Sequence, residues 1–256
     1  MDDAVALLRL QMEWGADEAL DPEPLDRLRP LQPATPAPIR PAVAVPAADQ
    51  PRATPAVRAA AVAAEAATLE ALREAIAGFD GCALRDTASH LVFGEGDPAS
   101  TTLIVGEAPG REEDRGGHPF AGPDGLLLDQ MLASIGLDRG RLMLTPLLPW
   151  RPPGGRPPNA NEVAICLPFL HRLITLQSPR RLVLFGGSAA RALLPATLAR
   201  RRTVPAWLDC GMQGVHQPLP VLNLPSLAEM QKTPALRRSA WAGLRLLRRA
   251  IDHDSP

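Results

Sequence analysis

From about residue 91 onward, short apolar runs alternate with segments of helical periodicity, and this alternation limits the fold more than any other feature. The apolar runs, which predict strands, are residues 101–105, 142–148, 181–185 and 221–224. The helical segments are residues 126–135, 161–176 (interrupted by Pro168), 188–194 and 234–251. Strands that alternate with helices form a parallel sheet covered on both faces. We therefore predict an α/β fold, a three-layer sandwich around a parallel sheet of about four strands.

In such sheets ligands bind beyond the carboxyl ends of the strands. The loops after residues 105, 148, 185 and 224 are therefore where we expect functional side chains.

The N-terminal part of the chain has a different organisation. Residues 1–20 predict a short amphipathic helix, which could dock on the body or on a protein partner. Residues 21–56 are rich in Pro and Ala and predict a semi-extended linker. Residues 57–80 predict a helix that leads into the domain, and residues 81–256 the domain itself.

Composition excludes several classes of protein. No run of about 18 apolar residues occurs, so we predict no membrane-spanning helix and no membrane partner. The acidic start, Met1-Asp2-Asp3, is unlike a secretory signal peptide, and three cysteines cannot form a dense disulfide framework. We expect a cytoplasmic location. Residues 1–80 carry 13 acidic and 7 basic side chains, whereas residues 81–256 carry 15 and 20, which permits a polyanionic partner.

The run Gly94-Glu95-Gly96-Asp97-Pro98-Ala99 imitates a dinucleotide-binding fingerprint. A strand follows it instead of a helix whose N-terminus could hold a pyrophosphate, so we interpret it as a turn. The sequence contains no G-x-x-x-x-G-K phosphate-binding pattern and no Ser-centred nucleophile elbow.

The most informative stretch is residues 103–125, LIVGEAPGREEDRGGHPFAGPDG. A strand ends at Gly106, and Glu107 follows at the carboxyl edge of the sheet. The loop Gly106-Glu107-Ala108-Pro109-Gly110 is tight, which would bring backbone amides close to a ligand. Phe120 has small neighbours and could leave one ring face open for a flat heterocycle such as a nucleobase. The alternative is that Phe120 is a core residue.

This stretch closely resembles motif 1 of the uracil-DNA glycosylases of the iron–sulfur branch, often called family four. The residues that match are 106–110, 112–114 and 117–122, and weaker similarity extends from near residue 81 to the C-terminal helix. The resemblance implies an α/β/α sandwich and hydrolysis of the N-glycosidic bond of uracil or another deaminated base in DNA. It implies that Phe120 stacks on the flipped base, that residues 106–110 grip it, and that Glu107 acts beside the anomeric carbon.

This chain lacks some of the cysteines that hold the iron–sulfur cluster in the family it resembles. Cys82 and Cys166 match two of its four cysteines, while Phe79 and Trp150 stand at the other two positions. Because a cluster normally takes four thiolates, we predict that the iron–sulfur cluster is lost and that no cofactor is bound. Phe79 and Trp150 would then fill its volume with apolar side chains.

Two catalytic positions also differ. The family places an Asn that reads uracil where this chain has Pro146, and a His that holds the leaving base where it has Leu224. Asn223 and Ser226 are candidate substitutes, as are His118 and His216. Two hypotheses follow: a DNA repair glycosylase, or a catalytically disabled or redirected member of the fold that binds nucleic acid.

The expected partner is DNA, single-stranded or with a flipped base. The motif 2 of the resembled family begins with the His that Leu224 replaces, and the candidate DNA-binding residues that follow it are Ser226, Lys232, Arg237 and Arg238. A second basic cluster, Arg200-Arg201-Arg202, could also contact phosphates. The alternative for both clusters is a solvated surface with cations at helix ends.

Overall fold

The structure is a computed structural model that describes residues 53–199, 205–215 and 217–254. Contacts divide the chain into two units, residues 1–51 and 52–256, and all of the described residues belong to the second unit. The helix predicted at residues 1–20, most of the linker, Arg200-Arg201-Arg202 and His216 lie outside the described residues.

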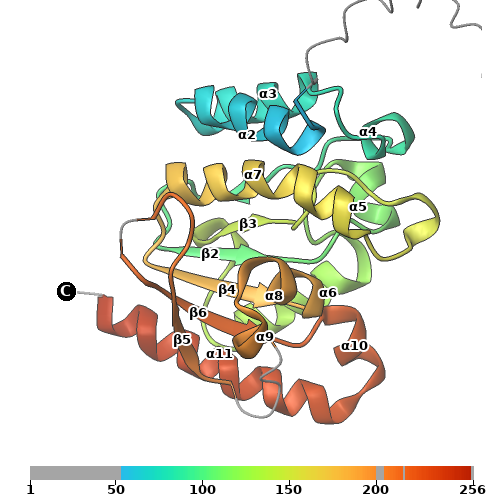
Figure 1. The fold of residues 1–256 in the computed structure, drawn as a ribbon. Coiled ribbons are helices and arrows are strands. Elements are labelled where there is room, and N and C mark those ends of the chain that lie inside the picture. Colours follow the sequence, from blue (N-terminus) through green and yellow to red (C-terminus); the bar gives the residue numbers. More distant parts are fainter. Residues whose placement is uncertain (1–52, 200–204, 216, 255–256) are drawn as a thin grey trace, which may run out of the picture. The chain divides into compact units, whose positions relative to one another are not determined.

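A six-stranded sheet forms the centre of this unit, in the order β1-β3-β2-β4-β6-β5 (Figure 1). The four inner strands are parallel to one another and confirm the predicted α/β fold. The two edge strands are antiparallel to their neighbours and were not predicted. The strands are β1 (Glu95–Gly96), β2 (Thr102–Val105), β3 (Met143–Thr145), β4 (Arg181–Phe185), β5 (Trp207–Cys210) and β6 (Leu219–Leu224).

We predicted about four strands and the sheet has six, because the two edge strands leave little signal in the sequence. β1 has only two residues and lies within the run that we interpreted as a turn. β5 holds Asp209 and follows a proline, so its period is weak. Short edge strands are a common way to prevent pairing between molecules.

Helices cover both faces of the sheet. On one face, α7 lies between the sheet and the helices α2 and α3, and on the other face lie α6, α10 and α11. Figure 1 views the sheet from its edge, so that these layers follow one another from top to bottom. The longer helices are α2 (Pro55–Glu65), α3 (Leu69–Gly78), α6 (Gly122–Ala133), α7 (Ala160–Gln177) and α11 (Pro234–Asp254). The shorter ones are α4 (Leu84–Thr87), α5 (Arg111–Gly116), α8 (Gly187–Leu193), α9 (Ala196–Ala199) and α10 (Leu227–Lys232).

The single helix predicted at residues 57–80 is two helices, and the prediction of one was wrong. Thr68 caps α3 by accepting a hydrogen bond from the Ala71 N–H at 3.1 Å. Arg172 of α7 donates two hydrogen bonds to the Ala66 carbonyl, at 2.9 and 2.7 Å. These bonds fix the break between α2 and α3 and attach both helices to α7, so they belong to the compact body.

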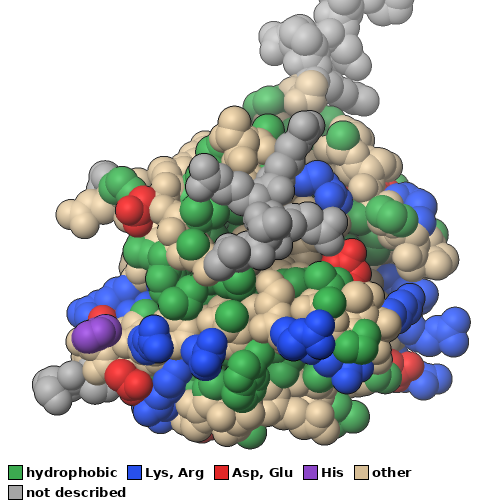
Figure 2. Space-filling model, turned by 90° about the horizontal axis from the view of Figure 1, so that it is seen from below, with side chains coloured by type: hydrophobic (Ala, Val, Ile, Leu, Met, Phe, Trp, Pro, Cys, Tyr) green, Lys and Arg blue, Asp and Glu red, His purple; other side chains and the backbone are tan. Residues whose placement is uncertain are grey.

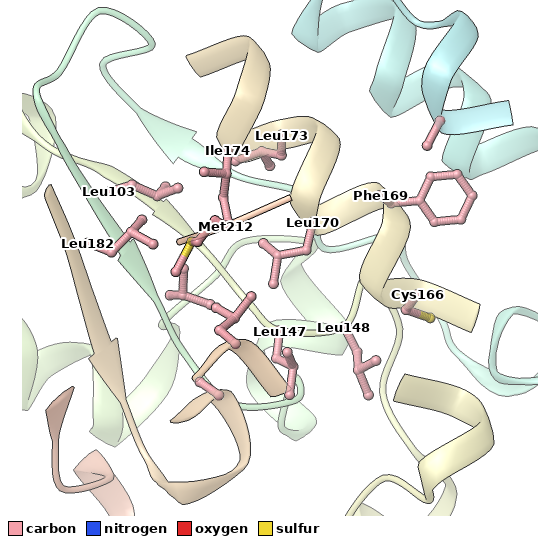
Figure 3. Close-up of a cluster of buried hydrophobic side chains, with 14 of the residues drawn as sticks. Leu103, Leu147, Leu148, Cys166, Phe169, Leu170, Leu173, Ile174, Leu182 and Met212 are labelled. Atoms are coloured by element: carbon pink, nitrogen blue, oxygen red, sulfur yellow. The ribbon is translucent and has the colours of Figure 1, made fainter. Parts of the chain in front are cut away.

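The core on the α7 face joins the strands to the helices directly. Figure 3 shows Leu103 and Leu182 of the sheet facing Leu170 and Ile174 of α7. All four are buried, and each such side chain stabilises the fold by about 1.5–3 kcal/mol. α7 continues through Pro168 and starts at a capping box in which Asn159 and Glu162 bond to each other's backbone N–H at 2.8 Å.

None of the helices in the described part of the chain is long and apolar enough to cross a membrane.

Candidate active site

A cleft of about 200 Å³ opens at the carboxyl edge of the sheet, where the loops after β2, β3 and β6 and the last residue of β4 meet. This is the edge where the alternating pattern predicted the site. Its lining residues are Gly106, Glu107, Ala108, Gly110, Glu113, Phe120, Asp124, Pro146, Phe185, Ser226, Leu227 and Ala228.

Glu107 lies in this cleft directly after β2. Its Oε1 accepts a hydrogen bond from the Ser188 N–H at 3.3 Å. The carboxylate packs so closely on Gly186 that a Cβ added there would lie 2.4 Å from Cδ of Glu107. Gly186 also has φ +102°, so glycine is required both for the turn and for this contact. The first residues of α8 therefore hold the Glu107 carboxylate in place.

Phe120 forms one wall of the cleft. Its ring lies over Gly106, where an added Cβ would come within 2.7 Å of Cζ, and packs edge-on against Phe185 with centroids 6.4 Å apart. The side chain is only 5% exposed, so the predicted open ring face is narrow and the ring also belongs to the core. Its backbone has φ +53°, an unusual conformation for a bulky residue.

Two side chains hold this strained backbone. Glu113 accepts hydrogen bonds from the N–H groups of Phe120 and Gly110, both at 2.6 Å. Arg139 donates to the Phe120 carbonyl at 2.8 Å. Burial raises the pKa of the Glu113 carboxyl, although the two N–H groups oppose the shift. Glu113 thus joins the Gly106–Gly110 loop to Phe120, a role that sequence reasoning missed because the residue stood out only as part of a matching acidic run.

The motif-2 candidates separate in the structure. Ser226 lines the cleft, is 5% exposed, and caps α10 by accepting a hydrogen bond from the Glu229 N–H at 3.1 Å. Asn223 alternates along β6 with Leu222 and Leu224, whose side chains pack on the α11 face, so it lies on the α7 face and not in the cleft. Leu224 is buried, with a methyl carbon 2.3 Å from a Cβ built on Gly243.

Several predicted residues lie beside the cleft or away from it. Pro109 is buried and does not line it. Lys232 lines an adjoining cleft of about 280 Å³ together with Arg111. Arg237 donates hydrogen bonds to the carbonyls at the end of α10, and Arg238 is exposed on α11. His118 is exposed and pairs with Glu95 at 3.3 Å.

The residues at the cluster positions do not fit an iron–sulfur cluster. Cys82 and Cys166 are buried with their Sγ atoms 3.9 Å apart. Phe79 and Trp150 are buried in the same core, and Phe79 packs edge-on against Phe169 at 5.3 Å. The cavity beside Cys166 measures about 20 Å³, room for about one water molecule. Two thiols and two packed rings cannot supply the four thiolates that a cluster needs.

The contact between the two thiols shifts their pKa values in opposite directions. A hydrogen bond from Cys166 lowers the pKa of Cys82 to about 7, while the same pairing together with burial raises that of Cys166. Figure 3 shows Cys166 on α7 about one turn before Phe169, whose ring lies next to the N-terminal helices.

Comparison with known proteins agrees with the site. The sequence profile of the family described as "Uracil DNA glycosylase superfamily" matches residues 93–245. A "Type-4 uracil-DNA glycosylase" from Pyrobaculum aerophilum is 41% identical over 49% of this chain and 64% of its own length. Proteins of the same name from Sulfurisphaera tokodaii and Archaeoglobus fulgidus are 38% and 43% identical, over 46% and 43% of this chain and 54% and 55% of their own lengths.

The chain thus spans from about half to two-thirds of the length of these curated relatives. The matched region contains the inner strands, the cleft and most of α11. The chain belongs to the uracil DNA glycosylase superfamily.

Proposed function

We propose that this protein is a DNA repair glycosylase that hydrolyses the N-glycosidic bond of uracil or another deaminated base. The observation that carries the proposal is the cleft in which Phe120 is held over Gly106 with Glu107 beside it. The relatives named as type-4 uracil-DNA glycosylases support the same reaction.

A base that is extruded from the DNA would enter this cleft. Enzymes that act on a base take it out of the stack and read it in a pocket. Phe120 would contact the base through the part of its ring that borders the cleft, and the loop formed by Gly106, Ala108 and Gly110 would enclose the base edge. Glu113 accepts hydrogen bonds from the N–H groups of Gly110 and Phe120, and so holds the loop and the ring that form two sides of this pocket at a fixed distance from each other.

In the reaction, a water oxygen forms a bond to the anomeric carbon while the bond to the base nitrogen breaks. The base leaves with the electron pair, and positive charge develops on the sugar in an oxocarbenium-like transition state. The Glu107 carboxylate would stabilise that charge and orient the water, whose proton it can accept. Its bond from the Ser188 N–H holds it in place for this role.

The departing base needs a hydrogen-bond donor for its negative charge. Pro146 lines the cleft and has no donor, and Leu224 is packed in the core. Ser226 accepts a hydrogen bond from the Glu229 N–H, and within the described residues no acceptor for its own hydroxyl proton is found. Of the candidate substitutes that the structure describes, which are Asn223, Ser226 and His118, only Ser226 lines the cleft, so we assign the donor role to it.

A base-release assay tests the proposal. Oligonucleotides with uracil, hypoxanthine or xanthine, single- and double-stranded, are incubated with excess protein, and abasic sites are counted. We expect release of at least one base, abolished in Glu107→Gln and reduced about 10²- to 10³-fold in Ser226→Ala. Arg73→Gln, an exposed change on α3, is the matched control. If no base is released while the DNA is still bound, the glycosylase proposal fails and a binding role replaces it.

A further inference from the structure

α11 carries a row of exposed cations on the side that faces away from the sheet. Arg238, Arg245 and Arg249 are all exposed and lie seven and four residues apart, a spacing that places them on one face of a helix. Trp241, 40% exposed, lies on the same side. We call these four residues the α11 stripe. Figure 2, which views the molecule from the α11 side, shows a band of basic side chains with apolar ones between them.

The three arginines of the α11 stripe have no carboxylate partner in the described part of the chain. The other arginines and the aspartates of α11 have partners: Arg248 pairs with Asp252 at 2.8 Å, Asp254 pairs with Arg180 and Arg181, and Arg237 donates hydrogen bonds to carbonyls of α10. The stripe is therefore a set of cations left over after the local ion pairs are made.

Helix stability does not account for this arrangement. Arg245 and Arg249 are four residues apart, and like charges at that spacing destabilise a helix. Cations are favoured in the last turn of a helix, but Arg238, Arg245 and Arg249 all lie before the last turn of α11, so the helix dipole does not explain them. A polyanionic ligand would remove the repulsion between Arg245 and Arg249.

The stripe continues from the candidate site. α10 ends at Lys232, which lines the cleft adjoining the active-site cleft, and α11 begins two residues later. Arg238 follows within the next two turns. From Arg238 to Arg249 the helix rises about 16 Å, a length over which a DNA strand presents several phosphates.

We propose that the α11 stripe is a second DNA contact, in which Arg238, Arg245 and Arg249 bind backbone phosphates beyond the target base and Trp241 stacks on an unpaired base. This rests on the proposed function for its ligand but concerns a different surface. Phosphate contacts carry no sequence information, so the stripe would strengthen binding to any DNA next to the target base. The exposed aromatic between cations is typical of surfaces that bind single strands.

The test measures affinity for DNA that contains no damaged base, so it does not depend on catalysis. Fluorescence anisotropy at several salt concentrations gives the slope of log affinity against log salt. Arg245→Gln with Arg249→Gln should flatten this slope by about 1.4 for single strands and 1.8 for duplexes. The control, Arg58→Gln with Arg73→Gln, removes two exposed charges from α2 and α3 on the other side of the sheet and should leave the slope unchanged.

Trp241→Ala should weaken binding of single strands about 5- to 150-fold with little change for duplexes. Thermal melting verifies that each variant is folded. If the Arg245/Arg249 variant keeps the slope of the unmodified protein, the phosphate contact is overturned; unchanged binding of single strands by Trp241→Ala overturns the stacking contact. Failure of base release with a flattened slope would refute the proposed function and leave this inference standing.

Discussion

Phe120 has two roles in the proposed site, as a core side chain and as the surface that meets the base, and two substitutions separate them. Phe120→Ala removes the ring and most of its packing against Gly106 and Phe185. Phe120→Leu keeps most of the apolar volume but has no flat ring. Ala and Leu both carry a Cβ, so each would meet the same strain at the φ of +53° found for Phe120, and this strain cancels when the two variants are compared.

The expected magnitudes depend on the burial of the ring. Replacing a buried Phe by Ala costs about 3–5 kcal/mol of folding free energy, and the lower end applies because part of the ring borders the cleft. Phe120→Leu should cost less than about 1.5 kcal/mol. Loss of base stacking should weaken substrate binding by about 1–3 kcal/mol in both variants, because neither presents an aromatic face.

Urea denaturation measures the first quantity, and anisotropy with uracil-containing and thymine-containing oligonucleotides measures the second. Binding is measured well below the melting temperature of the less stable variant. The reasoning requires similar losses of uracil-specific affinity in both variants despite their different stabilities. If Phe120→Leu binds and excises uracil as the unmodified protein does, Phe120 is a core residue only, and the base-stacking role is refuted.

Three further predictions concern positions where this chain departs from the family it resembles. Pro146→Asn places a side-chain amide and a backbone N–H in the cleft and should increase the rate of uracil release. Leu224→His should lower the free energy of unfolding by about 2–5 kcal/mol, because its imidazole would be buried against Gly243. Single-turnover kinetics and urea denaturation measure these effects, and a Leu224→His variant that is as stable as the original would show that this side chain can reach the cleft instead. The purified protein should be colourless and free of iron, since Phe79 and Trp150 fill the positions of two ligands; visible absorption typical of an iron–sulfur cluster would contradict this.

The inner sheet was predictable because its strands carry their own signal. Each is a short, largely apolar run that is followed by Gly or Pro, and β4 has the predicted bounds, Arg181–Phe185. The location of the site was predictable as well, because parallel strands direct their carboxyl ends to one edge. The edge strand β1 was missed because it has only two residues, Glu95 and Gly96. β5 was missed because it is not a continuous apolar run: it contains Asp209, and only Cys210 of its four residues is buried.

The division of residues 57–80 into α2 and α3 was missed for a different reason. Helix propensity is high on both sides of the break, and its local signal, the N-cap residue Thr68, is a single threonine in an Ala-rich run. The hydrogen bonds from Arg172 to the Ala66 carbonyl, which also hold the break, join residues 106 apart and leave no local trace in the sequence.

The sequence by itself determined the order of the four inner strands and of the longer helices between them, the edge at which the cleft lies, and the loop that holds Glu107 and Phe120. Only the tertiary structure decided which neighbouring residues share the cleft. Ser226 and Asn223 are three residues apart, yet the pleat of β6 directs Asn223 to the α7 face of the sheet, while the turn into α10 brings Ser226 to the cleft. Glu113 and Phe120 likewise became partners only through the folded loop, because hydrogen bonds between side chain and backbone depend on where the chain returns in space.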